Sequence, residues 1–117
     1  MTAIVGITQN KKVYMGADSA ISTEEYIGRL ANSKILKKKG LLIGGAGSSR
    51  CWTLIKTNLF PRVRQRKESA IDYVESAVVS GIRKIIKENG APLEGYTFLI
   101  GYRGKLFEVI EDWGVCE

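Results

Sequence analysis

Residues 41–49 read LLIGGAGSS, an apolar run followed by glycine, alanine and serine. The apolar part, residues 41–43, is typical of a strand that is buried on both faces. The small residues lead out of this strand into a helix, because Ser48 or Ser49 is a suitable N-cap and apolar residues then recur at helical spacing up to Leu59. This stretch therefore predicts a central strand that is followed directly by a helix.

A second helix is predicted after residue 68. Ser69 is a suitable N-cap with Asp72 three residues later, and Asn89-Gly90 supplies a C-terminal signal. The positions between them carry an apolar stripe with helical spacing, which consists of Ile71, Val74, Val78, Ile82 and Ile85. Two helices thus follow each other in the middle of the chain.

Hairpins flank the two helices. Residues 2–8 and 12–18 alternate and predict a first hairpin, whereas residues 96–101 and 105–110 predict a second one. Residues 19–32 are more polar and indicate an irregular or bent strand, and residues 34–38 a short strand before a turn at Lys39-Gly40. Strands, two helices and strands in this order predict one α+β domain over residues 1–117, with the helices layered on one face of a sheet.

Composition places the chain among ordinary folded proteins, with 44% apolar and 26% charged residues in 117. No apolar run approaches the ~20 residues that span a bilayer, and no secretory pattern opens the chain. We therefore expect a cytoplasmic protein without membrane contact. Cys51 and Cys116 have no metal-ligand spacing, and buried thiols are expected rather than a disulfide, although the sequence leaves both open.

The formal charge is +6, and the basic residues gather in two clusters. One is Lys37-Lys38-Lys39, and the other spans residues 62–67 with three arginines and a lysine. Both are expected to be solvated turns. A nucleic-acid partner is not expected, because interleaved aromatic residues and a recognisable binding module are absent from the sequence.

The chain contains no histidine. Histidine-based triads, histidine-containing metal sites and the usual proton shuttle near neutral pH are therefore excluded. The base of any catalytic site must then be a carboxylate, a lysine or the α-amine, and neither a metal nor another cofactor is expected.

Thr2 opens the first strand and becomes the N-terminal residue if the initiator methionine is removed. One residue then carries both a hydroxyl nucleophile and an amine base, whose ordinary pKa of about 8 suits that role. A nearby Lys34 ammonium would favour the neutral amine, Asp18 would pair with that lysine, and the amide of Gly47 would hold an oxyanion.

The chain resembles the proteasome-type N-terminal nucleophile hydrolases, namely proteasome β subunits and the bacterial two-ring heat-shock peptidase. Matching segments occur in the family's order along nearly the whole chain: residues 2–6, 15–19, 33–35, 43–48 and 99–102. The resemblance implies that Thr2 is the nucleophile, Asp18 and Lys34 the buried pair beside it, Gly47 the oxyanion donor, and Ser22 and Gly47 the substrate-binding positions.

By this resemblance the protein is a threonine peptidase or amidohydrolase that works without a cofactor on peptide or protein substrates. It would act in a ring-like oligomer, with an ATP-driven unfoldase as partner. The family fold continues beyond the point reached at Glu117, with a serine and an aspartate that support the threonine. An uncovered face of the first sheet is therefore expected. Ala20 stands where the family has an arginine. The alternative is a non-catalytic, proteasome-like subunit that assembles rings.

Overall fold

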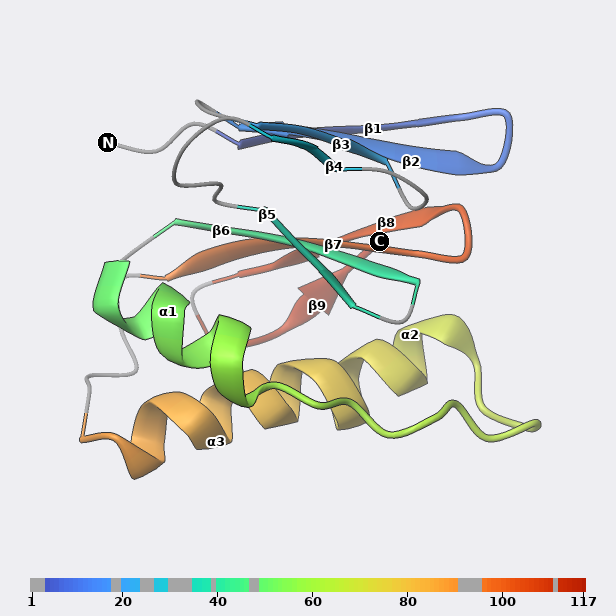
Figure 1. The fold of residues 1–117 in the computed structure, drawn as a ribbon. Helices are drawn as coiled ribbons and strands as arrows, with labels where there is room; N and C mark the ends of the chain where they lie inside the picture. Colours follow the sequence, from blue (N-terminus) through green and yellow to red (C-terminus); the bar gives the residue numbers. More distant parts are fainter. Residues whose placement is uncertain are drawn as a thin grey trace.

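The structure, a computed structural model, describes residues 4–17, 20–23, 27–29, 35–38, 40–46, 49–90, 96–110 and 112–117. The strands in these ranges form two antiparallel sheets, here named sheet A and sheet B, and the helices cover one face of sheet B. Figure 1 shows the resulting order of layers, with sheet A above, sheet B in the middle and the helices below. The predicted α+β class, with helices on one side of a sheet, is confirmed.

Sheet A contains, in spatial order, β1 (Ile4–Gln9), β2 (Lys12–Ala17), β3 (Ala20–Thr23) and β4 (Ile27–Arg29). The first hairpin was predicted from sequence and is confirmed. Asn10 and Lys11 between its strands have positive φ angles of 53° and 61°, as a two-residue turn that matches the strand twist requires. The predicted irregular strand is instead, in its described part, the antiparallel pair β3 and β4.

Sheet B contains β5 (Ile35–Lys38), β6 (Leu41–Ala46), β7 (Thr97–Tyr102), β8 (Lys105–Val109) and β9 (Val115–Cys116) in spatial order. Leu41, Leu42 and Ile43 in β6 are fully buried, which confirms the predicted strand with two covered faces. The sequence did not predict β9, because two residues are too few to form an alternating pattern.

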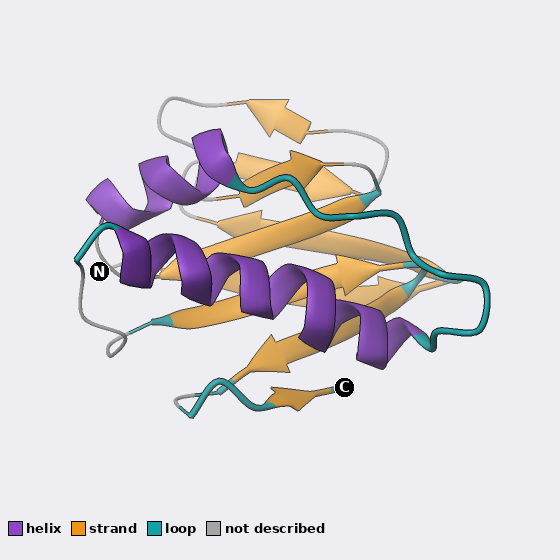
Figure 2. Ribbon diagram, turned by 90° about the horizontal axis from the view of Figure 1, so that it is seen from below, coloured by secondary structure: helices purple, strands orange, loops and turns teal. Residues whose placement is uncertain are grey.

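The helical layer consists of α1 (Ser49–Asn58) and one continuous second helix, which is made of α2 (Ala70–Tyr73), the π segment η1 (Val74–Val79) and α3 (Ser80–Glu88). Figure 2 shows both helices lying across the strands. The N-cap at Ser69 is confirmed, since its Oγ accepts from the Asp72 amide at 3.2 Å. The π segment was not predicted.

A π segment has wider turns than an α-helix, and the buried face of the second helix is accordingly broader than the predicted stripe. Tyr73, Val79 and Ile86 are buried in addition to the stripe residues, whereas Ile71 is only half-buried. The Tyr73 ring packs against Tyr102 of β7, with 4.9 Å between ring centroids and 34° between the ring planes. The helix therefore packs on sheet B through aromatic as well as aliphatic side chains.

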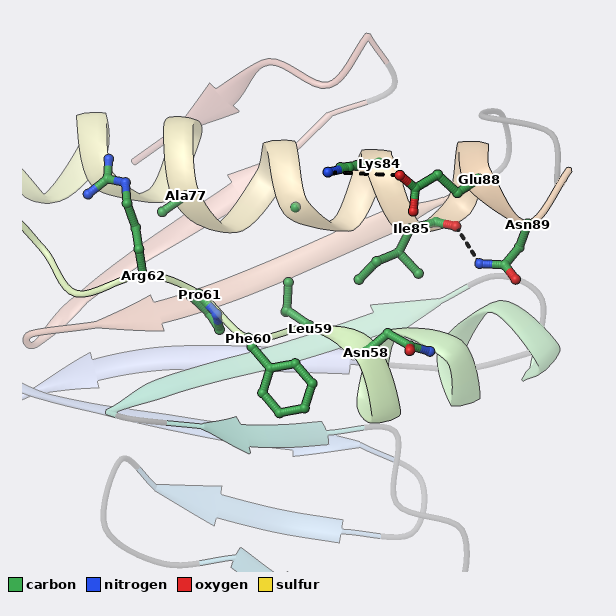
Figure 3. A pocket seen from close by; sticks show the side chains of 11 residues that line it. Asn58, Leu59, Phe60, Pro61, Arg62, Ala77, Lys84, Ile85, Glu88 and Asn89 are labelled. Atoms are coloured by element: carbon green, nitrogen blue, oxygen red, sulfur yellow. Dashed lines mark hydrogen bonds and ion pairs between the residues drawn. The ribbon is translucent and has the colours of Figure 1, made fainter.

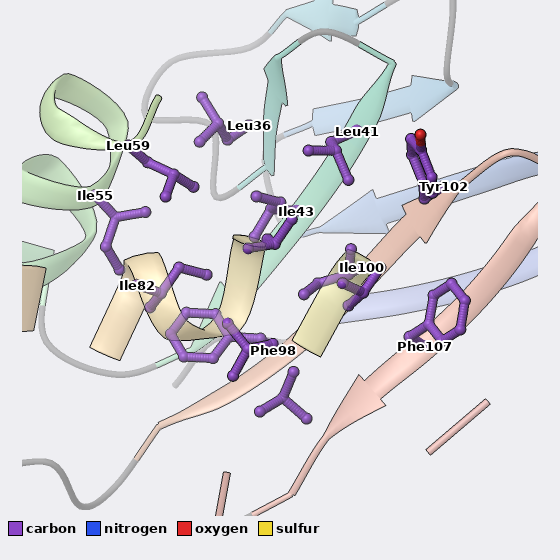
Figure 4. Close-up of a cluster of buried hydrophobic side chains, with 14 of the residues drawn as sticks. Leu36, Leu41, Ile43, Ile55, Leu59, Ile82, Phe98, Ile100, Tyr102 and Phe107 are labelled. Atoms are coloured by element: carbon purple, nitrogen blue, oxygen red, sulfur yellow. The ribbon is translucent and has the colours of Figure 1, made fainter. Parts of the chain in front are cut away.

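Two apolar clusters fill the spaces between the layers. The helix-side core lies between sheet B and the helices and contains eighteen of the described buried residues, among them Ile43, Ile82, Ile100 and Phe107 (Figure 4). The sheet-side core lies between the two sheets and contains four, namely Val13, Met15, Ile35 and Leu42. Most of the apolar burial in the described chain thus stabilises the contact between helices and sheet B.

On the described part of sheet A, the outward side chains of β1 and β2 are exposed. Residues of β1 alternate, so that Ile4 faces sheet B whereas Val5 and Ile7 point outward and are 64% and 55% exposed. Tyr14 of β2 is 37% exposed. This face presents apolar side chains to solvent.

Two expectations about single residues need correction. Cys116 is exposed in the short edge strand β9, so the predicted burial of this thiol is wrong. The basic segment 62–67 is not a merely solvated turn, because Arg62 and Arg64 make hydrogen bonds that hold the connection between α1 and α2. Cys116 is exposed because β9 lies at the edge of sheet B, and the arginines are held because Glu68 lies within reach of both.

Candidate active site

Four of the predicted site residues, Thr2, Asp18, Lys34 and Gly47, lie outside the residues that the structure describes. Each is one or two positions from a described strand end. β1 begins two residues after Thr2, β2 ends directly before Asp18, β5 begins directly after Lys34, and β6 ends directly before Gly47. These four strand ends are therefore the described parts of the chain that lie nearest in sequence to the predicted site residues.

Strand register brings the four ends together in pairs. In sheet A, Ile4 at the start of β1 stands opposite Ala17 at the end of β2. In sheet B, Ile35 at the start of β5 stands opposite Gly44 near the end of β6. One pair of ends lies in each sheet.

The two pairs meet across the space between the sheets at Gly44. A Cβ atom built on Gly44 would lie 2.8 Å from Ile4 Cγ2 and 2.8 Å from Met15 Sδ. Only a residue without a side chain therefore lets β1 and β2 approach β6 so closely. We refer to this place, where Ile4, Ala17, Ile35 and Gly44 come together, as the inter-sheet corner.

The described surroundings of the inter-sheet corner are apolar. Met15 and Ile35 are 2% exposed and belong to the sheet-side core, against which Ile4 packs. Apolar surroundings disfavour the charged form of an amine and strengthen nearby charge interactions. An amine base placed beside this core would be biased toward its neutral, proton-accepting form.

Ser22 lies in β3, and the structure describes its backbone. It stands opposite Met15 of β2 on one side and opposite Ile27 of β4 on the other. Both edges of β3 are thus occupied within sheet A at this position. The prediction that the Ser22 backbone pairs with a substrate strand has no support from this register, because no open strand edge remains there.

Sequence reasoning missed a polar network in the connection between the helices. The Arg62 guanidinium donates to both carboxylate oxygens of Glu68 and, at 2.9 Å, to Ser76 Oγ. Tyr73 Oη donates to the Arg62 carbonyl at 2.7 Å. The hydrogen bond from Arg62, helped by the Gln65 amide, lowers the pKa of Glu68 to about 2. The charge-assisted hydrogen bonds between Arg62 and Glu68 therefore hold the two ends of this connection together.

The same connection forms one wall of a groove of about 390 Å³, here named the helix-side groove. Residues 58–62 line one side, and residues 77–89 of the second helix line the other. Figure 3 shows Leu59 and Ile85 pointing toward each other between the two walls, while Phe60 points away from the helix. The sequence signal that was missed is a pair of apolar residues, Phe60 just before the basic segment 62–67 and Val63 within it.

Among the described residues, no group of three or more histidine, cysteine, aspartate or glutamate side chains is placed to hold a metal ion. The helices in the described ranges are too short or too polar to cross a membrane. No family model, curated protein or solved structure matches the chain.

Proposed function

We propose that this chain is a threonine-type N-terminal nucleophile hydrolase that cleaves peptide bonds. The observation that carries the proposal is the inter-sheet corner, where the strand ends next to Thr2, Asp18, Lys34 and Gly47 converge. Further support comes from the two facing antiparallel sheets with helices on one side, an arrangement compatible with the resemblance to proteasome-type hydrolases.

In the proposed reaction the Thr2 hydroxyl oxygen attacks the substrate carbonyl carbon while the α-amine accepts the hydroxyl proton. The carbonyl oxygen becomes an oxyanion, which the Gly47 amide stabilises. Collapse breaks the C–N bond, and the protonated amine delivers its proton to the leaving nitrogen. Water then hydrolyses the ester and restores the threonine. The Lys34 ammonium, which pairs with Asp18, favours the neutral form of the amine between steps.

The test begins with processing. Intact-mass spectrometry reports whether Met1 is absent, and the processed protein is then incubated with a peptide epoxyketone and, separately, with a peptide vinyl sulfone. The epoxyketone needs both the hydroxyl and the free amine, whereas the vinyl sulfone needs only the nucleophile. We expect both adducts on Thr2, and none on Thr2→Ala.

Two control variants sharpen this result. Thr2→Ser keeps hydroxyl and amine and should retain adduct formation. Lys34→Met should reduce the labelling rate by a factor of about 10² or more, because it removes the group that favours the neutral amine. A correctly processed protein that forms neither adduct contradicts the proposal.

A second candidate function is a non-catalytic subunit of a ring-like assembly. The outer face of sheet A favours it, because Val5, Ile7 and Tyr14, which stands opposite Ile7, place exposed apolar side chains next to one another there. This candidate predicts retained Met1, no adduct and a stable oligomer in sedimentation velocity. An ATP-driven unfoldase remains the partner that the resemblance implies for the catalytic alternative.

A further inference from the structure

A second groove, here named the β9 groove, lies between the second helix and the turn that leads into β9. It has a volume of about 230 Å³, and four helix residues from Glu75 to Arg83 line one side while residues 113–115 line the other. Val79 on the helix side is buried, and Trp113 and Val115 are half-buried. Pockets for drug-sized ligands usually exceed about 300 Å³. The β9 groove therefore suits a single apolar side chain of a larger partner.

The Trp113 indole is held in place at this groove. Its ring packs against Phe98 with 5.9 Å between centroids. The Trp113 amide donates to the Ile110 carbonyl at 2.9 Å, and the Gly114 amide donates to Asp112 Oδ1 at 2.8 Å. The φ angle of Trp113 is 68°, in the left-handed region that a residue with a side chain rarely adopts. Such conformations persist where surrounding contacts impose them, and they cluster at binding sites.

The open edge of β9 borders the same groove. β9 is the last strand of sheet B, and in the described ranges it pairs with β8 alone. Val115 of β9 stands opposite Val109 of the helix-side core, so it faces the helices and lines the groove. An extended segment added to this edge would place every second side chain on the same face. The edge and the groove thus offer backbone pairing and side-chain binding to one partner.

Opposite charges stand at the two ends of the helix wall of the β9 groove. Glu75 and Arg83 are both exposed, and no ion pair joins either of them to another described residue. They are eight positions apart, which corresponds to about 12 Å along a helix at about 1.5 Å per residue. Four residues of an extended segment cover about 13 Å at about 3.3 Å per residue. The two charges are therefore spaced for side chains four positions apart on one face of such a segment.

The direction of the strand fixes the order of the complementary charges. In Figure 1 the second helix runs from α2 on the right to α3 on the left, whereas the C-terminus lies to the right of β9. A segment antiparallel to β9 therefore runs with the helix and passes Glu75 before Arg83. All strand pairs of the described sheets are antiparallel, which favours this direction. The matching segment has a basic residue first and an acidic residue second.

We propose that β9 and the β9 groove bind an extended segment of a protein partner, which pairs antiparallel with β9. An apolar side chain of the segment enters the groove between Val79, Trp113 and Val115. The residue two positions before it is basic and faces Glu75, and the residue two positions after it is acidic and faces Arg83. This inference is independent of the proposed catalysis, because the groove lies on the helix side of sheet B and the inter-sheet corner lies on the other side.

The probe is a fluorescent peptide of about nine residues with the central sequence Lys-Thr-Phe-Thr-Glu. The first matched peptide has the order Glu-Thr-Phe-Thr-Lys, and the second replaces phenylalanine by serine. The third is N-methylated at phenylalanine and at the threonine after it, which removes one N–H donor from each edge of the segment. Fluorescence anisotropy measures the affinities. We expect the first peptide to bind about tenfold or more tightly than each of the other three, which is about 1.4 kcal/mol.

Variants locate the site. Glu75→Lys with Arg83→Glu keeps the net charge and should invert the preference between the two charge orders. Trp113→Gly suits the left-handed backbone but removes the indole, so it should weaken binding of the first peptide about tenfold or more. The matched control, Lys84→Glu with Glu88→Lys, exchanges two charges of the same helix outside the β9 groove and should leave the preference unchanged. Circular dichroism verifies that all three proteins are folded.

Several results would overturn the inference. One is absence of binding by the first peptide, and another is equal binding of the two charge orders or a preference that the exchange at Glu75 and Arg83 does not invert. Undiminished binding of the N-methylated peptide would show that the segment does not pair with β9. Dimers in sedimentation velocity that Trp113→Gly dissociates would indicate a second copy of the chain as the occupant. Shifts of the Val115 and Cys116 amides in NMR spectra with the first peptide would support the inference.

Discussion

The two faces of sheet B are covered in different ways. The face toward the helices is filled by large side chains, including Phe98, Ile100 and Phe107, in a cluster of eighteen of the described buried residues. On the face toward sheet A, the described buried residues number four, and there glycine lets the backbones approach. Among the described residues, the helix side thus supplies most of the apolar burial, whereas the sheet side brings strand ends into close contact. The interface between the two sheets is therefore the one that suits a site formed by residues at strand ends.

The largest expected effect concerns neighbouring residues on opposite faces of β8. Phe107 is fully buried in the helix-side core, and Leu106 is half-buried and packs against the sheet-side core. We expect Phe107→Ala to lower the free energy of unfolding by about 3–5 kcal/mol. Leu106→Ala should cost less than about 2 kcal/mol, because less apolar area is lost. Urea unfolding measures both, and equal losses would contradict the contrast between the two faces.

The second effect tests the close approach at the inter-sheet corner. Gly44→Ala introduces a Cβ at 2.8 Å from both Ile4 Cγ2 and Met15 Sδ, so these side chains must shift, at a cost of about 1–3 kcal/mol. Gly16→Ala is the matched control in β2, since a Cβ there meets no atom within 4 Å. Its effect on stability should be small. Thermal unfolding compares the two, and a harmless Gly44→Ala would show that the corner is loosely packed.

The same two variants also test whether the inter-sheet corner affects the proposed catalysis. Gly44→Ala should slow labelling of Thr2 by the vinyl sulfone, because Gly44 is three residues before Gly47 in the strand that leads to it. Gly16→Ala should label at the rate of the unaltered protein.

The smallest effect concerns the polar network outside both cores. Because the pKa of Glu68 is about 2 in the folded protein and about 4.5 ordinarily, its carboxylate favours folding above pH 4.5. This contribution is lost as the pH falls from 4.5 toward 2. Glu68→Gln should therefore lower the melting temperature at pH 7, and the difference from the unaltered protein should shrink toward pH 2.

Glu88→Gln provides the control for that titration. Glu88 pairs with Lys84 at 3.8 Å on the exposed face of α3, where such a pair contributes little. Its melting temperature should follow that of the unaltered protein over the whole pH range. A Glu68→Gln curve that also did so would show that the network is dispensable.

Local signals in the sequence were sufficient for most elements. The alternation in β1 and β2, the Ser69 cap and the apolar stripe of the second helix each depend on residues within one turn or one strand. These predictions were confirmed because each of them depends only on residues that are close in sequence. The π segment η1 and the short edge strand β9 escaped prediction, because their formation depends on what packs against them.

The candidate site illustrates the same limit. Thr2, Asp18, Lys34 and Gly47 were proposed from residue chemistry and from family resemblance, and no spacing rule could say whether their strands meet. Ser22 was assigned to substrate pairing by the same reasoning, but its strand is enclosed by β2 and β4. Residue type predicts which chemistry is available, whereas strand order decides which backbone edge is open.

By itself, the sequence determined the α+β class, the order of strands and helices, the excess of positive charge and the exclusion of histidine chemistry. These are properties of composition and of short-range pattern. Only the tertiary structure decided that β1 and β2 cross β6 at Gly44, that Arg62 binds Glu68 rather than solvent, and that Phe60 and Val63 remain exposed. The physical reason is that each of these depends on which distant segments pack together, and packing between layers has no period in the sequence.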